Sequence, residues 1–327
     1  MTWQLVGHDW AVSLLQQSLA TDRTAHAYLF AGPPQIGKTL LALRLAQALN
    51  CRAHTPPCGQ CVSCRKIEQH IHPDVELVES GDSSGILKID QVRDLQRKAV
   101  LAPFEGVYRV FILKQADQAS IEAANSLLKI LEEPPAHVVL ILTAVQADSL
   151  PPTVVSRCQR LDLRPLPRRV VEGTLRERGL PPDQAQLLGR LSGGRIGWAL
   201  HACENEETLH QRTKDLDLLM QLLQASRVDK IEFAWTASRN PDSVPPLIEL
   251  WMTWWRDVLM MKSQGEEHLV NVDRFDQLRS LAGQSDLHQA WSILKTLQET
   301  AAQLEANVNT RLALEGLLLR LPLWNES

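Results

Sequence analysis

Residues 32–39 have the types and spacing that bind the phosphates of a nucleotide. They read Gly-Pro-Pro-Gln-Ile-Gly-Lys-Thr, so Gly32, Gly37, Lys38 and Thr39 occupy the fixed positions of a phosphate-binding loop. The backbone N–H groups of such a loop point inward, and the N-terminus of the following helix adds partial positive charge. Lys38 is expected to reach the β- and γ-phosphates of ATP, or the β-phosphate of ADP, and the Thr39 hydroxyl to ligate Mg²⁺.

One residue of the loop leaves nucleotide binding open. Many loops of this type carry Gly at the position of Gln35, and a side chain there restricts the backbone dihedrals. The alternative is a tight strand-to-helix turn that contains Gly and Lys without binding a nucleotide.

The acidic residues that hydrolyse ATP are missing from the expected place. Such a site needs one carboxylate to hold Mg²⁺ and a second to polarise the attacking water, just past a core strand. After the apolar run 108–113 this chain has Lys114 and Gln115, and Asp117 lies two residues farther. We therefore predict that the chain has no ATPase activity of its own. In an alternative arrangement, Lys114 takes the place of the metal and neutralises phosphate.

Four cysteines after the loop have the spacing of a metal site. Cys51, Cys58, Cys61 and Cys64 form the pattern C-x₆-C-x₂-C-x₂-C, which suits tetrahedral Zn²⁺. Because all four ligand positions are filled, no open position remains for catalysis, and the zinc is expected to be structural. Competing interpretations are a disulfide pair, which a reducing cytosol disfavours, and redox chemistry at Cys58 and Cys61, which leaves two cysteines unexplained. Three nearby histidines are expected on the surface: His54, His70 and His72.

Alternating strands and helices must position these groups. Strands are predicted at 27–31, 73–79, 108–113 and 138–143, and helices at 4–20, 39–50, 89–102 and 120–132. This alternation predicts an α/β fold with a largely parallel sheet. Strand signals fade after Pro165, and the rest of the chain reads as helical.

We place domain boundaries near residues 165 and 207. The predicted domains are a nucleotide-binding-like domain at 1–165 with the zinc module at 51–64, a small helical domain at 166–206, and a helical domain at 207–327. The last domain holds six of the nine tryptophans, most of which are expected in its core. Arg256 and Asp257 are expected on the exposed side of their helix.

Composition excludes some classes of protein. The 327 residues are 44% hydrophobic, which is enough for real cores, and no apolar run is long enough to span a membrane. The first residues lack the regions of a signal peptide, so a cytoplasmic location is expected. A net charge of −4 argues against a protein that coats nucleic acid by bulk charge.

Motifs along most of the chain resemble those of the clamp-loader ATPases of the AAA+ class. They are Val6-Gly7, residues 26–30, the phosphate loop, the cysteines, residues 125–135 with Leu-Leu-Lys-Ile-Leu-Glu-Glu-Pro-Pro, residues 150–158 with Ser-Arg-Cys, and residues 255–259 and 307–315. The resemblance implies an AAA+ P-loop domain with a zinc insertion, a small helical lid domain and a C-terminal helical collar that joins subunits.

The resemblance also gives Arg157 a role. The family's Ser-Arg-Cys motif carries an arginine finger, and a guanidinium suits the charge that develops on a γ-phosphate. Because Arg157 follows the last predicted strand, it is expected to point toward a neighbour's nucleotide. The alternative is a surface arginine in a salt bridge.

Other positions of the family pattern have lost their catalytic side chains. The expected polar sensor falls on Ala144 and Val145, and the arginine of a second sensor falls on Gly197, two residues from Arg195. The resemblance therefore implies a non-hydrolysing stator that joins delta and tau/gamma subunits in a pentamer, which places the sliding clamp on primed DNA. A polymerase label would apply only through the holoenzyme.

Two other functions stay open at this point. One is an ATP-hydrolysing subunit of the tau/gamma type, against which Lys114 and Gln115 argue. The other is a zinc-dependent nucleic-acid-binding module, for which the cysteine segment offers only Arg52, Arg65 and Lys66 as nearby cations.

Overall fold

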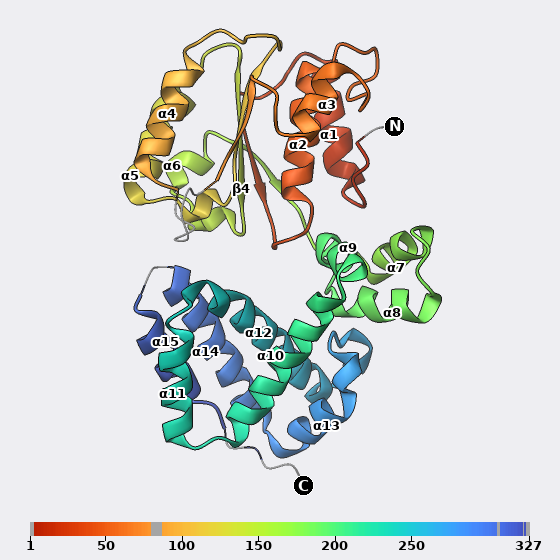
Figure 1. Ribbon diagram of the computed structural model, residues 1–327, viewed down its shortest axis with the longest axis vertical. Coiled ribbons are helices and arrows are strands. Elements are labelled where there is room, and N and C mark those ends of the chain that lie inside the picture. The colour runs from red at the N-terminus through yellow and green to blue at the C-terminus, as the bar shows by residue number, and fades with distance from the viewer. Residues whose placement is uncertain (1–2, 80–86, 306–307, 323, 325–327) are drawn as a thin grey trace. The chain divides into compact units, whose positions relative to one another are not determined.

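The computed structural model describes residues 3–79, 87–305, 308–322 and 324 (Figure 1). The chain divides into two compact units. One consists of residues 1–170 with 195–197, and the other of residues 171–194 with 198–327. The finer division into three domains stays a prediction.

The first unit contains a sheet of parallel strands, which confirms the predicted α/β class. The strands are β1 Ala27–Ala31, β2 Val75–Val78, β3 Arg109–Leu113, β4 Val138–Ala144 and β5 Gln159–Asp162. Their order is β2-β3-β4-β1-β5, and each neighbouring pair is parallel. The sequence prediction missed β5, because only Leu161 of its four residues is buried and the alternation is too short to detect.

Helices cover both faces of this sheet. They are α1 Asp9–Ala20, α2 Lys38–Asn50, α3 Val62–Glu68, α4 Ile89–Ala99, α5 Ile121–Glu132 and α6 Pro152–Val155. Figure 1 shows α4 and α5 on one face and α1 and α2 on the other. Along β1, Leu29 packs into the cluster of the α4–α5 face, whereas Tyr28 and Phe30 pack into that of the α1–α2 face. Short 3₁₀ turns in this unit are Ala116–Gln118 and Ala147–Ser149.

The described remainder of the chain is helical, as predicted. Its helices are α7 Arg168–Glu177, α8 Pro182–Leu191, α9 Ile196–Glu204, α10 Glu206–Gln224, α11 Arg227–Ala237, α12 Val244–Lys262, α13 Phe275–Gln284, α14 Leu287–Glu305 and α15 Thr310–Leu318, with 3₁₀ turns at Pro241–Ser243, Glu266–His268 and Val272–Arg274. Asn307, the first residue of the late family motif, lies outside the described residues. Asn309 begins α15 by accepting a hydrogen bond from the N–H of Leu312.

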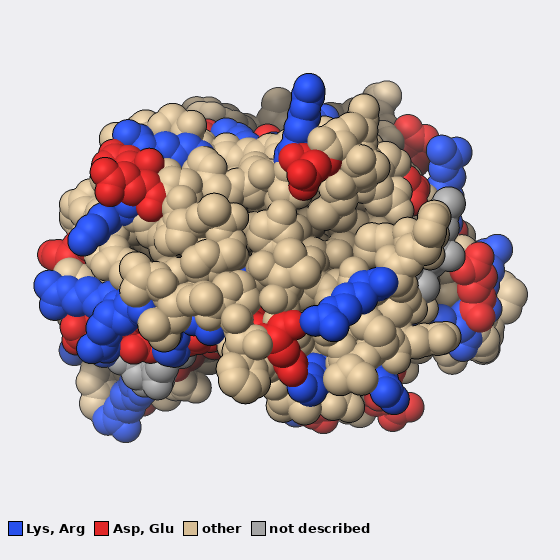
Figure 2. Space-filling view, turned by 90° about the horizontal axis from the view of Figure 1, so that it is seen from above, with Lys and Arg blue, Asp and Glu red and all other residues tan. Residues whose placement is uncertain are grey.

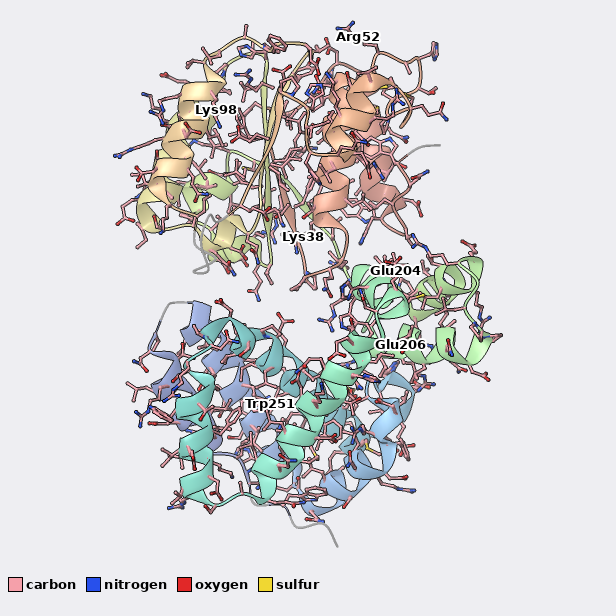
Figure 3. The ribbon with its side chains drawn as sticks, in the orientation of Figure 1. Lys38, Arg52, Lys98, Glu204, Glu206 and Trp251 are labelled. Atoms are coloured by element: carbon pink, nitrogen blue, oxygen red, sulfur yellow. The ribbon has the colours of Figure 1, made fainter. Side chains whose placement is uncertain are left out.

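Tryptophans of α12 form the centre of the second unit. Trp251, which Figure 3 labels, Trp254 and Trp255 are completely buried among leucines of the neighbouring helices, which confirms their predicted core role. Trp235 and Trp291, in contrast, are 44% and 52% exposed.

The expectation that Asp257 lies on an exposed face is wrong. Its side chain is completely buried, and its carboxylate accepts hydrogen bonds from the N–H groups of Val270 and Asn271 and from the Asn271 amide. Burial raises the pKa of Asp257 despite these donors. Asp257 therefore holds the segment before α13 against α12, whereas Arg256 stays partly exposed.

The face of the molecule drawn in Figure 2 shows no single dominant charge. In Figure 2, Lys and Arg are interspersed with Asp and Glu around a broad uncharged area. Among the described residues, no helix is long and apolar enough to cross a membrane.

Candidate functional site

The phosphate loop joins β1 to α2, as the sequence predicted. A Cβ atom at Gly32 would lie 2.3 Å from the carbonyl oxygen of Leu163, so only glycine fits there. Gly37 has a φ of 109°, in a region that side chains rarely adopt, and α2 begins at the next residue. The loop therefore lies at the carboxyl end of β1 and at the positive end of the α2 dipole, where parallel α/β proteins bind anions.

Gln35 takes the backbone conformation that glycine would take at this position. Its φ is 58°, which costs a residue with a side chain roughly 1 kcal/mol. The Gln35 carbonyl accepts a hydrogen bond of 2.8 Å from the N–H of Gly197, and the Ile36 carbonyl lies 3.3 Å from Nε2 of His8. Two segments distant in sequence thus fasten the outer carbonyls of the loop, and they offset the strain at Gln35.

Lys38 turns back onto its own loop. Its ammonium donates hydrogen bonds to the carbonyls of Gly32 and Pro33, the latter at 2.8 Å. Figure 3 places Lys38 at the start of α2, at the end of the sheet opposite Arg52. The cation predicted to meet phosphate is therefore held at the loop itself.

The cation directly after β3 is not placed at the loop. Lys114 forms an ion pair of 2.7 Å with Glu79, which follows β2. Because β4 separates β3 from β1, this pair directs Lys114 away from the loop strand. The alternative in which Lys114 replaces the metal therefore finds no support here.

Asp117 has a structural partner that sequence reasoning missed. Its Oδ2 accepts a hydrogen bond of 2.7 Å from the N–H of Val145, just past β4. The carbonyl of Val145 in turn accepts a bond from the N–H of Gly32. Asp117 thus fastens the end of β4 beside the loop. Only one feature of the sequence indicated this contact, namely an acidic residue near the end of a predicted strand.

The two sensor positions carry no phosphate-binding side chain. Ala144 is the buried last residue of β4, and Val145 follows it. A Cβ atom at Gly197 would lie 2.7 Å from the Gln35 carbonyl oxygen, so this backbone contact excludes any side chain, including the arginine of the family pattern. Gly197 acts here through its N–H group.

Arg157 lies on the turn after α6, with its side chain 35% exposed. Its guanidinium donates one hydrogen bond of 2.8 Å to Oε1 of Glu132 and another of 2.8 Å to the carbonyl of Thr153. The prediction that Arg157 follows the last core strand is wrong, because β5 comes after it and pairs with β1. Arg157 therefore belongs to the β4–β5 connection.

The cysteine cluster has the geometry of a metal site. The sulfur atoms of Cys51, Cys58, Cys61 and Cys64 all lie within 4.8 Å of one another, with Cys58–Cys64 and Cys61–Cys51 both at 4.0 Å. Ligands of a tetrahedral ion with Zn–S bonds of about 2.3 Å lie about 3.8 Å apart. A disulfide, with sulfurs about 2 Å apart, does not fit these separations. The four cysteines can therefore hold one metal ion.

Backbone donors prepare these sulfurs to carry negative charge. The N–H groups of Cys58, Cys61 and Cys64 point at the sulfurs of Cys51, Cys58 and Cys61, respectively, at 3.3–3.4 Å. The N–H groups of Gln60 and Cys61 lower the pKa of Cys58 to about 6, whereas burial raises the pKa of Cys51 and Cys64. A cation at the centre would stabilise all four as thiolates.

Buried polar groups fasten the cysteine segment to the helix that follows the phosphate loop. Arg44 and Gln47 of α2 both bond to Glu68 of α3, and Gln47 also donates to the carbonyl of Cys64 at 2.8 Å.

The expectation that His72 lies on the surface is wrong. His72 is buried, its Nδ1 accepts a hydrogen bond from the N–H of Asp74, and burial lowers its pKa.

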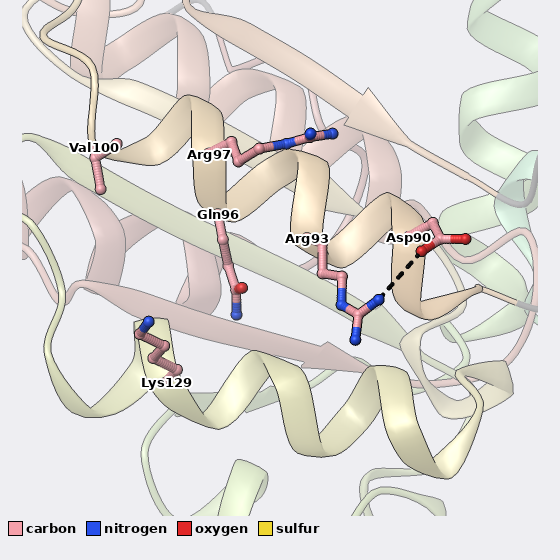
Figure 4. Close-up of a pocket in the computed structure, with 6 residues that line it drawn as sticks. All are labelled: Asp90, Arg93, Gln96, Arg97, Val100 and Lys129. Atoms are coloured by element: carbon pink, nitrogen blue, oxygen red, sulfur yellow. Dashed lines mark ion pairs between the residues drawn. The ribbon is translucent and has the colours of Figure 1, made fainter.

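A groove of about 690 Å³ lies between α4 and α5. Its lining residues are Asp90, Arg93, Gln96, Arg97, Val100 and Lys129. Figure 4 shows Arg93 and Gln96 projecting from α4 toward α5, which supplies Lys129. Asp90 lies 3.6 Å from Arg93. Three cations against one carboxylate give the lining a net positive charge.

Comparisons with known proteins identify the family. Residues 7–167 match the family described as DNA polymerase III, delta subunit, and residues 206–322 match its C-terminal counterpart. DNA polymerase III subunit delta' of Bacillus subtilis is 31% identical over 314 residues, which are 95% of this chain and 94% of that protein. The Pseudomonas aeruginosa subunit delta' is 30% identical over 96% of each chain.

The first part of the chain is also similar to a second kind of subunit. DNA polymerase III subunit tau of Bacillus subtilis is 36% identical over 174 residues, which are 52% of this chain and 30% of that protein. The similarity to the delta' proteins, in contrast, extends over nearly the whole of both chains. This chain therefore belongs to the family of DNA polymerase III delta' subunits.

Proposed function

We propose that this chain is the non-hydrolysing stator subunit of a bacterial clamp loader, and that it donates Arg157 to the ATP site of a neighbouring subunit. The observation that carries the proposal is a contrast between two sets of residues: those at the strand ends, where catalytic side chains are expected, and Arg157. At the carboxyl ends of β3 and β4 the catalytic positions hold Lys114, Gln115, Ala144 and Val145, whereas Arg157 keeps a partly exposed guanidinium.

The same contrast argues against an ATP-hydrolysing role for the chain. Without a carboxylate for Mg²⁺ and a second to orient water, the barrier to phosphoryl transfer stays high even if a nucleotide binds. The glycines of the loop and the position of Lys38 support weak binding of ATP or ADP at Gly32, Gly37, Lys38 and Thr39. The domain that holds this loop, residues 1–165, is proposed to be an AAA+ P-loop domain, with residues 166–206 as its lid.

The metal of the cysteine cluster is proposed to be structural Zn²⁺. Four sulfur ligands leave no position for a reacting water. The hydrogen bonds from Gln47 to the Cys64 carbonyl and from Arg44 to Glu68 support a role in holding α3 against α2. The ion would therefore act on stability, and only indirectly on the loop.

The helices after residue 206 are proposed to be the collar that joins the chain to delta and tau/gamma subunits in a pentamer. Apolar side chains are exposed along two of them. On α11 these are Val228, Ile231 and Trp235, and on α14 they are Leu287 and Trp291. Their spacing of three to four residues places each set on one helix face, which suits packing against a partner helix.

The groove between α4 and α5 is proposed as a surface of this chain that meets the phosphates of primed DNA in the assembly. We expect Lys129→Glu to weaken binding of primed DNA by the assembled complex and to reduce the slope of log K against log salt by about one to two, because it removes a cation and adds an anion. Arg23→Glu changes an exposed cation after α1 and is the matched control. Equal effects of both changes on the salt slope would contradict the assignment of the groove.

Reconstitution tests the proposed function. The assay mixes purified delta and tau/gamma subunits, the sliding clamp and primed DNA, with or without this chain. It reproduces in vitro the clamp loading that we propose for the bacterial cytoplasm. We expect ATP-dependent clamp loading and a five-chain complex in native mass spectrometry only when the chain is present. Full loading in its absence would contradict a stator role.

A further inference from the structure

We propose that Glu132 is the resting partner of Arg157, which holds the guanidinium until the phosphates of a neighbour's nucleotide replace the carboxylate. This inference rests on the proposed arginine-finger role and assigns a regulating residue to it. Glu132 would then compete with the nucleotide for the same cation.

The contacts of Arg157 define a resting position. Nη2 donates to Oε1 of Glu132 and Nη1 donates to the carbonyl of Thr153, both at 2.8 Å. Only one of the two carboxylate oxygens is used, so the pair lacks the two parallel bonds of the strongest arginine–carboxylate geometry. Among the described residues, the contact with Thr153 is local, between α6 and the turn after it, and the contact with Glu132 joins that turn to α5.

The position of Glu132 disfavours a role in the stability of its helix. Glu132 is the last residue of α5 and Glu133 is its C-cap, so two carboxylates lie at the negative end of the helix dipole. A carboxylate there repels the unpaired carbonyls, whereas a cation would be favoured. Arg157 compensates for part of this repulsion. The charge of Glu132 is therefore explained by its partner, and not by α5.

The exposure of the pair makes exchange feasible. The side chains of Arg157 and Glu132 are 35% and 51% exposed, and ion pairs in such surroundings change an equilibrium constant by a factor of about one to five. A triphosphate presents several charged oxygens, which bind guanidinium more strongly than one carboxylate oxygen does. The phosphate can therefore displace Glu132, while the hydrogen bond from Nη1 to the Thr153 carbonyl keeps the guanidinium in place.

The test compares Glu132→Gln with Glu133→Gln in the fully assembled complex. Glutamine keeps the size and an acceptor oxygen of glutamate but removes its charge. We expect Glu132→Gln to lower the ATP concentration for half-maximal hydrolysis by about twofold to fivefold and to leave the maximal rate unchanged. Glu133→Gln, which alters a neighbouring charge without a hydrogen bond to Arg157, should leave both quantities unchanged.

A third variant separates this proposal from the proposed function. In an Arg157→Ala background, Glu132→Gln should have no effect on half-saturation, because the competing cation is gone. An unchanged half-saturation in Glu132→Gln, an equal shift in Glu133→Gln, or a shift that persists without Arg157 would each overturn the proposal. If Arg157→Ala strongly reduces hydrolysis while Glu132→Gln does nothing, only the resting-partner role fails. If Arg157→Ala itself does nothing, both fail.

Discussion

Arg157→Ala is expected to lower ATP hydrolysis at the adjoining site of the assembled clamp loader by about a thousandfold, because arginine fingers contribute about 10³ or more to phosphoryl transfer. The chain itself should fold normally, since the change removes only a partly exposed ion pair, which contributes less than about 1 kcal/mol. Single-turnover hydrolysis by the assembled complex measures the first effect, and thermal unfolding of the isolated chain measures the second.

Arg160→Ala is the matched control for this change. Arg160 lies three residues farther along, is exposed, and pairs with Asp148 and Asp162. Its loss should leave hydrolysis by the complex unchanged. If both variants hydrolyse ATP at the rate of the unaltered complex, Arg157 is a surface arginine in a salt bridge and has no catalytic role.

Removal of the metal is expected to have the largest effect on stability. The binding free energy of structural Zn²⁺ in four-ligand sites is about 10 kcal/mol or more, and it is coupled to folding of the segment that binds it. A strong chelator, or Cys61→Ser, should therefore unfold residues 51–64 and release α3 from α2. Element analysis should give one zinc per unaltered chain, and limited proteolysis should cleave the treated chain within this segment.

Cys203→Ser provides the control for the cysteine cluster. Cys203 is a free thiol outside the cluster, so its replacement should leave the zinc content and the cleavage pattern unchanged. A chain that is purified without metal and still resists cleavage between Cys51 and Cys64 would contradict a structural ion.

Features encoded in short runs of sequence were predictable. The phosphate loop and the cysteine cluster each occupy fewer than twenty residues, and their chemistry depends on local spacing. Buried strands such as β1 and β4 were also predictable, because all of their residues are buried and apolar runs identify them. These local signals located the glycine-containing loop, the four clustered cysteines, and Lys114 and Gln115 at the end of β3.

Contacts between distant segments were not predictable in the same way. Strand β5 exists because its backbone pairs with β1, although three of its four residues are polar. The burial of Asp257 depends on donors at Val270 and Asn271, and the contact of Gly197 with Gln35 depends on the folded chain. The pairing of Arg157 with Glu132, 25 residues earlier, likewise requires β4 and α6 to bring the two together. Periodicity and propensity contain no information on such pairings.

The most direct test of the central claim is ATP hydrolysis by the isolated chain in the presence of Mg²⁺, with a tau/gamma-type subunit as the positive control. Because Lys114 and Gln115 stand where catalytic carboxylates are expected, the chain should release phosphate no faster than its Lys38→Ala variant does, even at saturating ATP. The account would be contradicted if the isolated chain hydrolysed ATP at about 1 s⁻¹, in the range of ordinary enzymes, in a reaction that requires Mg²⁺ and that Lys38→Ala abolishes.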